Sequence, residues 1–194
     1  MTQAVILAYL AIGIGLASYI PYFFSIAKGK TKPHAFSWFI WGLLTTIAFF
    51  AQMAGGAGTG AWVTGFTAAL CYAIVVAALF KGEKQITKSD WATFLGALFT
   101  LPVWYMTKDP LAAIILITII DALGFYPTFR KSWHKPHEEM PLAYGLSGLK
   151  FLIALFALEN FTATTALYPF SLVVMNWIFV AMVLWRRKAV SIHV

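Results

Sequence analysis

The chain has 194 residues, of which 61% are hydrophobic and 11% are charged, and its formal net charge is +7. A soluble domain contains about 45–50% apolar and about 25% charged residues, so this composition excludes both a soluble globular protein and a disordered chain. The single Cys excludes a disulfide scaffold. In a chain this apolar, the positive charge indicates membrane orientation, and we expect no nucleic-acid partner.

Seven stretches are apolar enough to cross the hydrocarbon core of a bilayer, which takes roughly 20 residues of helix. We expect these spans at residues 4–26, 37–54, 61–80, 90–106, 110–129, 141–158 and 164–185. Polar or basic segments separate most of them, and residues 54–60 form a glycine-rich stretch that we expect to be a flexible loop. The sequence therefore predicts an all-α integral membrane protein with seven transmembrane helices and no soluble domain.

The basic residues predict how this protein crosses the membrane. Twelve of the 14 Lys and Arg residues follow the first, third, fifth or seventh span. The positive-inside rule then places the N-terminus outside and the C-terminus in the cytoplasm. The first span lacks a preceding basic segment and a small-residue cleavage site, so we expect it to be retained. The short loops favour the plasma membrane of a bacterium, which is the inner membrane.

An internal repeat relates the two halves of the chain. The sequence Lys-Pro-His occurs at residues 32–34 and again at 135–137, and Trp41-Gly42-Leu43 corresponds to Tyr144-Gly145-Leu146 at the same offset. Residues 19–23 correspond to 125–129 after one three-residue deletion, whereas spans 3 and 7 match only loosely, with Cys71 aligned to Asn176. We therefore predict a first triple-helix repeat at 1–83, a linker helix at 84–108 and a second repeat at 109–194. Both repeats enter the membrane in the same direction, which implies a pseudo-twofold axis along the membrane normal.

This 3+1+3 arrangement, with a proline near the inner end of the first helix of each triplet, resembles the PQ-loop/SWEET superfamily. The chain lacks the Pro-Gln dipeptide, since the prolines occur as Pro21-Tyr22 and Pro127-Thr128. The resemblance implies a membrane transporter or facilitator that moves a small polar solute, such as a sugar or an amino acid, by alternating access at a midplane site. Proton coupling and a homo-oligomeric state are left open. The alternative is a membrane receptor of the same fold that does not translocate its ligand.

Two charged residues, Asp121 and Lys150, lie inside apolar spans. Each is roughly 14 Å from the basic end of its helix, close to the membrane midplane. Because consecutive spans usually pack as neighbours, we expect the two residues to form a pair. Ionisable groups inside a membrane are functional by default, so the pair is predicted to bind a zwitterionic solute or to exchange protons with it. The alternative is a static bridge between the helices.

Uncharged residues complete the candidate site. Asn176 is predicted to bind the solute, as the asparagine in the last helix of the resembled sugar facilitators does, or to form hydrogen bonds between helices. Trp41 and Tyr144 occupy equivalent positions and are candidates for stacking on the solute. Trp38 is assigned to the membrane interface, which tryptophan favours, with stacking on the solute as the alternative.

The prolines and the loop residues have predicted roles of their own. Pro21 and Pro127 are candidate hinges, with helix ends as the alternative. Tyr126, beside the second proline, is a candidate gate residue. Lys32 to His34 and residues 135–139 are expected to be solvated loops that contact lipid headgroups, with no metal site. The sequence contains no catalytic or nucleotide-binding motif, so we predict neither an enzyme nor a cofactor.

Overall fold

The computed structural model describes residues 2–191, apart from the side chains of seven residues between 93 and 107 and that of Ser191. The described chain is helical, with the elements α1 (Gln3–Ala27), α2 (Ala35–Ala54), α3 (Gly60–Lys81), α4 (Lys88–Thr107), α5 (Pro110–His134), the 3-10 turn η1 (Pro136–Glu138), α6 (Pro141–Phe156) and α7 (Ala163–Ser191). Each of the seven expected spans is thus a helix. Within the described residues, five helices are long and apolar enough to cross a membrane, and α6 is a shorter apolar helix. This is the architecture of a multi-pass helical membrane protein.

Two helices extend beyond their predicted ends. Helix α5 ends at His134 and α7 at Ser191, whereas the apolar stretches end at residues 129 and 185. The added turns are basic, and cations are favourable at the C-terminus of a helix because they oppose its dipole. Pro21 and Pro127 lie within α1 and α5, which continue past them. The helix-end alternative for these prolines is therefore wrong, and their role as hinges stays a prediction.

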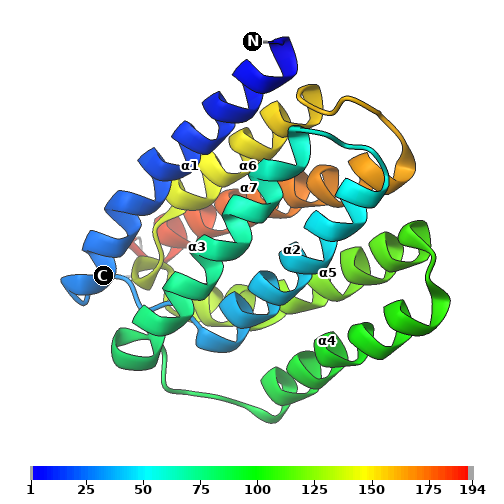
Figure 1. The fold of residues 1–194 in the computed structure, drawn as a ribbon. Helices are drawn as coiled ribbons and strands as arrows, with labels where there is room; N and C mark the ends of the chain where they lie inside the picture. The colour runs from blue at the N-terminus through cyan, green and yellow to red at the C-terminus, as the bar shows by residue number, and fades with distance from the viewer. Residues whose placement is uncertain (1, 192–194) are drawn as a thin grey trace.

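The packing of the helices follows a twofold pattern. Helix α1 packs against α3 and α6, and α5, four helices later, packs against α7 and α2 (Figure 1). The contact between α2 and α3 has its counterpart between α6 and α7. Helix α4 has no equivalent and lies at the edge of the bundle, against α5 and α2 (Figure 1). We refer to α1–α3 and α5–α7 as the two three-helix units. The division of the chain at residues 83 and 109 stays a prediction.

Individual contacts follow the same pattern. The Ser18 hydroxyl on α1 donates a hydrogen bond to the backbone carbonyl of Ala143 on α6, at 3.0 Å. The equivalent residues are Gly124 on α5 and Ile40 on α2, and a Cβ atom added to Gly124 would lie 3.0 Å from the Ile40 Cγ2 atom. Both interfaces between the units thus depend on a small residue at the same position.

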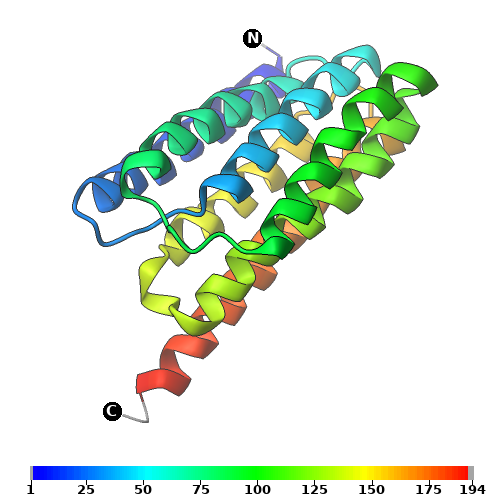
Figure 2. The ribbon, with the colours of Figure 1, turned by 90° about the horizontal axis from the view of Figure 1, so that it is seen from below.

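The two ends of the bundle differ in composition. The N-terminus of α1 and the C-terminus of α7 lie at opposite ends (Figure 2). We call the end formed by residues 28–34, 82–87 and 135–140 the basic end, and the end formed by residues 55–59, 108–109 and 157–162 the opposite end. Between them, large apolar side chains such as Phe24, Phe80 and Phe156 are exposed on the outside of the bundle. A soluble monomer rarely exposes so much apolar surface, so we assign these faces to lipid.

Candidate functional site

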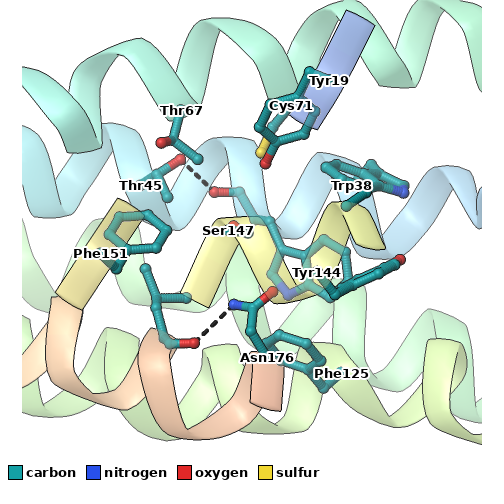
Figure 3. Close-up of a pocket in the computed structure, with 13 residues that line it drawn as sticks. Tyr19, Trp38, Thr45, Thr67, Cys71, Phe125, Tyr144, Ser147, Phe151 and Asn176 are labelled. Atoms are coloured by element: carbon teal, nitrogen blue, oxygen red, sulfur yellow. Dashed lines mark hydrogen bonds between the residues drawn. The ribbon is translucent and has the colours of Figure 1, made fainter. Parts of the chain in front are cut away.

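A cavity lies between the two three-helix units (Figure 3). Every helix except α4 contributes to its wall, which is made of Tyr19, Trp38, Trp41, Thr45, Thr67, Cys71, Phe125, Ala143, Tyr144, Ser147, Phe151, Leu172 and Asn176. The cavity has a volume of only about 30 Å³ available to the centres of water molecules. This is room for one or two waters, so a larger solute enters only if the wall moves.

Helical periodicity explains why these side chains share one wall. Trp38, Trp41 and Thr45 are spaced by three and four residues on α2, which places them on one face of the helix. Tyr144, Ser147 and Phe151 have the same spacing on α6. Trp41 and Tyr144 are equivalent in the repeat, and both line the cavity. The cavity therefore lies where equivalent faces of the two units meet.

Aromatic rings form much of the wall. The ring centroid of Trp41 lies 4.6 Å from that of Phe125 and 5.1 Å from that of Trp38. Trp38 was assigned to the membrane interface, but it is only 4% exposed, so this interpretation is wrong. Helix α2 begins at Ala35, and His34 and Ser37 are buried beside Trp38, so this end of the helix lies inside the bundle.

Polar side chains provide hydrogen-bond acceptors in the same wall. The Thr45 hydroxyl donates to the Trp41 carbonyl at 2.5 Å, and the Thr67 hydroxyl donates to the Val63 carbonyl at 2.7 Å. Their protons are thereby used within the helix, and their lone pairs remain as acceptors. The Asn176 amide donates to the Leu172 carbonyl of its own helix at 2.7 Å (Figure 3). That bond gives no support to the alternative in which Asn176 joins two helices.

The predicted pair of Asp121 and Lys150 does not form. Asp121 Oδ1 accepts a hydrogen bond from the Tyr168 hydroxyl at 3.0 Å, and its Oδ2 is buried without a partner. Lys150 Nζ donates to the Tyr19 hydroxyl at 3.4 Å. Each charge costs about 2.5–3.5 kcal/mol at the centre of a membrane helix on insertion scales. In this conformation, neither residue offsets that cost for the other.

The twofold packing explains why this expectation is wrong. Helix α6 packs against α1, whereas α5 packs against α2, so neighbours in sequence lie in different interfaces. The stem of Lys150 lies along Gly15, with its Cδ atom 3.5 Å from the position of an added Cβ. Gly15 is the equivalent of Asp121 in the repeat, and Ile47 is the equivalent of Lys150. The two charges therefore lie on opposite sides of the pseudo-twofold axis, and neither is part of the cavity wall.

Tyr126 lies outside the cavity. Its side chain is 53% exposed and borders a shallow groove on the outer surface of α5. A helix turns by about 100° per residue, so Phe125 faces the cavity while the next residue faces outward. Tyr144, by contrast, lines the cavity, and its hydroxyl donates a hydrogen bond to Glu139 at the basic end.

A buried ion pair closes the basic end beneath the cavity. Glu139 is 2% exposed, and its Oε1 lies 2.8 Å from Lys131 Nζ. Its Oε2 accepts hydrogen bonds from the hydroxyls of Tyr22, at 3.2 Å, and Tyr144, at 3.4 Å. Arg187 donates to the Glu139 carbonyl at 2.6 Å. The expectation of a solvated loop at residues 135–139 is therefore wrong at Pro136 and Glu139, which are buried.

A second polar cluster at the basic end surrounds Asp90, which is fully buried at the start of α4. Its carboxylate lies 3.0 Å from Arg130 Nη2 and 3.3 Å from His34 Nε2, and it accepts the Thr87 N–H at 2.7 Å. Burial lowers the pKa of His34, an effect that the nearby Asp90 carboxylate only partly opposes. His34 was expected in a solvated loop, and its burial corrects that expectation.

The connection between α3 and α4 is fixed by a separate pair. Glu83 Oε2 lies 3.0 Å from Lys135 Nζ. Burial alone would raise the pKa of Glu83, but hydrogen bonds from the Gln85 N–H, the Lys135 ammonium and the Lys84 N–H lower it to about 2. The carboxylate is therefore charged at neutral pH, and it joins the α3–α4 connection to the end of α5.

Different contacts close the opposite end. The Gln52 amide donates to the Thr165 carbonyl at 3.1 Å, and the Asn160 amide donates to the Gly55 carbonyl at 3.3 Å. The loop that we expected to be flexible is thus held against residues 159–165. Gly58 has φ +59, and a Cβ there would collide with the Glu159 carboxylate, so the turn requires glycine.

Part of this site was predicted from the sequence. Trp41, Tyr144 and Asn176 were predicted as site residues and line the cavity, whereas the remaining lining residues were not predicted. A usable signal was present, because Thr67 and Cys71 are four residues apart and so share one face of a helix. No such signal marks Glu139, whose partners Lys131 and Tyr22 come from other helices.

No family model, no curated protein and no solved structure matches this chain. Within residues 2–191, no group of His, Cys, Asp and Glu side chains is arranged to hold a metal ion. A function is therefore inferred from the cavity, its two closures and the repeat.

Proposed function

We propose that this chain is a membrane transporter that carries a small polar solute by alternating access. One observation supports this most strongly. A cavity at the interface of two three-helix units is lined by all six of their helices, and a different set of contacts is present at each end of the bundle. In transporters built from parallel repeats, the solute site lies at such an interface, near the membrane midplane.

The two closures connect the units to each other, which suits alternating access. At the basic end, Glu139 accepts from Tyr22 of α1, so it joins the second unit to the first. At the opposite end, Gln52 of α2 donates to Thr165 of α7 and again joins the two units. Rocking one unit against the other would break one closure while the other held. Pro21 and Pro127, at equivalent positions in α1 and α5, are the proposed hinges.

The family and the orientation are part of the same proposal. The repeat, the paired prolines and the twofold packing favour membership of the PQ-loop/SWEET superfamily. The excess of Lys and Arg favours a cytoplasmic basic end and an N-terminus outside. On this assignment, the Glu139 closure faces the cytoplasm and the Gln52 closure faces the exterior.

Uptake into proteoliposomes tests the proposal. The purified protein is reconstituted, and a panel of labelled sugars, amino acids and organic acids is offered with and without a proton gradient. We expect saturable uptake of at least one solute, and slower uptake by Trp41→Phe, which alters the cavity wall. Trp62→Phe is the matched control, because Trp62 lies on the outer face of α3 and is absent from the wall.

The same panel separates the alternatives. Ligand binding without uptake would favour a receptor of this architecture. Uptake that is equally fast in Trp41→Phe and in the wild type would contradict the assignment of the cavity. If no solute is bound or moved, the proposed function is wrong.

A further inference from the structure

Lys150 occupies a built site beside the cavity. Its side chain is fully buried, and its stem passes Gly15, with the Lys150 Cδ atom 3.5 Å from the position of an added Cβ. The ammonium lies over two aromatic rings, 4.7 Å from the centroid of Tyr19 and 4.8 Å from that of Phe151. Both rings belong to the cavity wall. The ammonium therefore contacts two side chains that line the cavity.

This ammonium lacks an anionic partner among the described residues. Its hydrogen bond goes to the Tyr19 hydroxyl, which is neutral, and no described carboxylate lies within ion-pair distance. The contrast with the basic end is sharp, since the buried Lys131 is paired with Glu139 at 2.8 Å. A buried ammonium has three hydrogens to donate and is costly when they are left unpaired.

Other donors in the wall are also unpaired. The indole N–H groups of Trp38 and Trp41 are buried and have no acceptor among the described residues. An indole N–H can only donate a hydrogen bond. A rearrangement within the protein would satisfy it only by bringing an acceptor atom close. A ligand that carries several strong acceptor oxygens would satisfy these groups and the ammonium together.

We propose that Lys150 and Tyr19 bind the carboxylate of a small organic anion at the α1–α6 side of the cavity. This inference rests on the proposed function, and it names the class of solute that the cavity takes. One lysine neutralises one carboxylate, whereas a phosphate, with a charge between −1.5 and −2 at about pH 7, would leave charge uncompensated. The equivalent position in the other unit is Ile47, so the carboxylate binds on one side of the axis only.

Matched pairs of probes test this proposal directly. Thermal unfolding and tryptophan fluorescence of the detergent-purified protein are measured with lactate, benzoate and nicotinate, and with the neutral amides lactamide, benzamide and nicotinamide. Each acid and its amide have nearly the same shape, so a difference in response within a pair shows that the protein recognises the carboxylate. Each measurement is repeated on Lys150→Met, which keeps the length of the side chain, and on Lys30→Met, which removes the same charge at an exposed position.

We expect at least one acid to raise the unfolding temperature of the wild type and of Lys30→Met, and its amide not to. Lys150→Met should lose that response while remaining folded, because an apolar side chain replaces a buried charge. Tyr19→Phe keeps the ring and removes one hydrogen bond to the site, so we expect it to bind the acid about two- to tenfold more weakly. This variant serves as the test if Lys150→Met is not recovered in folded form.

Two results would overturn the inference. One is that no acid stabilises the wild type more than its amide. The other is that Lys150→Met and Tyr19→Phe respond to the acids as the wild type does. Binding and transport are judged separately, because these measurements need no flux. Carboxylate binding without uptake would support this inference and contradict the proposed transport. Uptake of a neutral solute alone would support transport and contradict this inference.

Discussion

Tyr144 connects the cavity to the ion pair that closes the basic end. Its ring lies in the cavity wall, with its centroid 4.3 Å from that of Phe179, while its hydroxyl donates to Glu139 Oε2 at 3.4 Å. The same carboxylate is held by Lys131 and by Tyr22 from the other unit. A change in the cavity that moves this ring therefore acts on the contacts that close the basic end.

The ion pair between Lys131 and Glu139 is the first target for mutation. Lys131→Met leaves a buried carboxylate without its cation, which typically costs about 3–5 kcal/mol. We expect a clearly lower unfolding temperature in detergent, or an open basic end if the protein relieves the cost by admitting water. Lys30→Met removes an exposed cation and should leave the unfolding temperature unchanged. Equal unfolding temperatures for the two variants would contradict the assigned role of the pair.

Cys71 allows opening of the basic end to be followed without an introduced label. It is the only cysteine in the chain, it is buried, and it lines the cavity. Tyr144→Phe removes the hydrogen bond to Glu139 but keeps the ring. We expect a membrane-impermeant methanethiosulfonate to modify Cys71 faster in this variant than in the wild type, measured by mass spectrometry. Tyr126→Phe, at an exposed tyrosine on the outer surface, is the matched control and should react like the wild type.

Substitution of Asp121 can distinguish a role in transport from a role in folding. Its Oδ1 accepts from Tyr168, while Oδ2 is unpartnered, so an amide at this position keeps the accepting oxygen and removes the buried charge. We expect Asp121→Asn to fold with an unfolding temperature equal to or above that of the wild type, and to lose transport. Asp109→Asn, at the N-cap of α5, conserves a good capping residue and should retain transport. Full uptake by folded Asp121→Asn would show that the carboxylate has no part in the cycle.

Much of the fold follows from the sequence because membrane spans are long and apolar. The helices and their approximate ends were predicted in this way, and the correspondence of Trp41 with Tyr144 led directly to two facing residues of the cavity. The neighbours of each helix were not predicted. The expected pair of Asp121 and Lys150 assumed that α5 and α6 pack together, but twofold packing places α6 against α1.

The polar contacts at the basic end were harder to predict for a physical reason. A charged residue in a connecting segment or in the first turn of a helix is usually solvated, and Glu139 and Asp90 are buried through side-chain partners that are distant in sequence. Tyr22 lies on α1, more than a hundred residues before Glu139, and Arg130 lies on α5, forty residues after Asp90. Composition and periodicity carry no information on such pairs, so they emerge only from the assembled bundle.

The repeated Lys-Pro-His sequence provides an internal comparison of a buried histidine with an exposed one. His34 is fully buried and faces the Asp90 carboxylate, with the cations Arg130 and Lys131 also nearby. His137, at the equivalent position, is exposed. Burial holds the pKa of His34 below its usual value of about 6.5, so the folded state keeps this imidazole neutral where the unfolded chain would take up a proton.

The sign of the pH dependence follows from this difference. The contribution of His34 to stability is complete above about pH 6.5 and falls as the pH decreases from there towards the lower pKa of the folded state. We expect the unfolding temperature of the wild type to fall more steeply between about pH 7.5 and 5.5 than that of His34→Asn, which cannot take up a proton. His137→Asn should follow the wild type, because the His137 side chain is exposed. If His34→Asn and the wild type lost stability with the same slope, the buried imidazole would be excluded as a source of acid sensitivity.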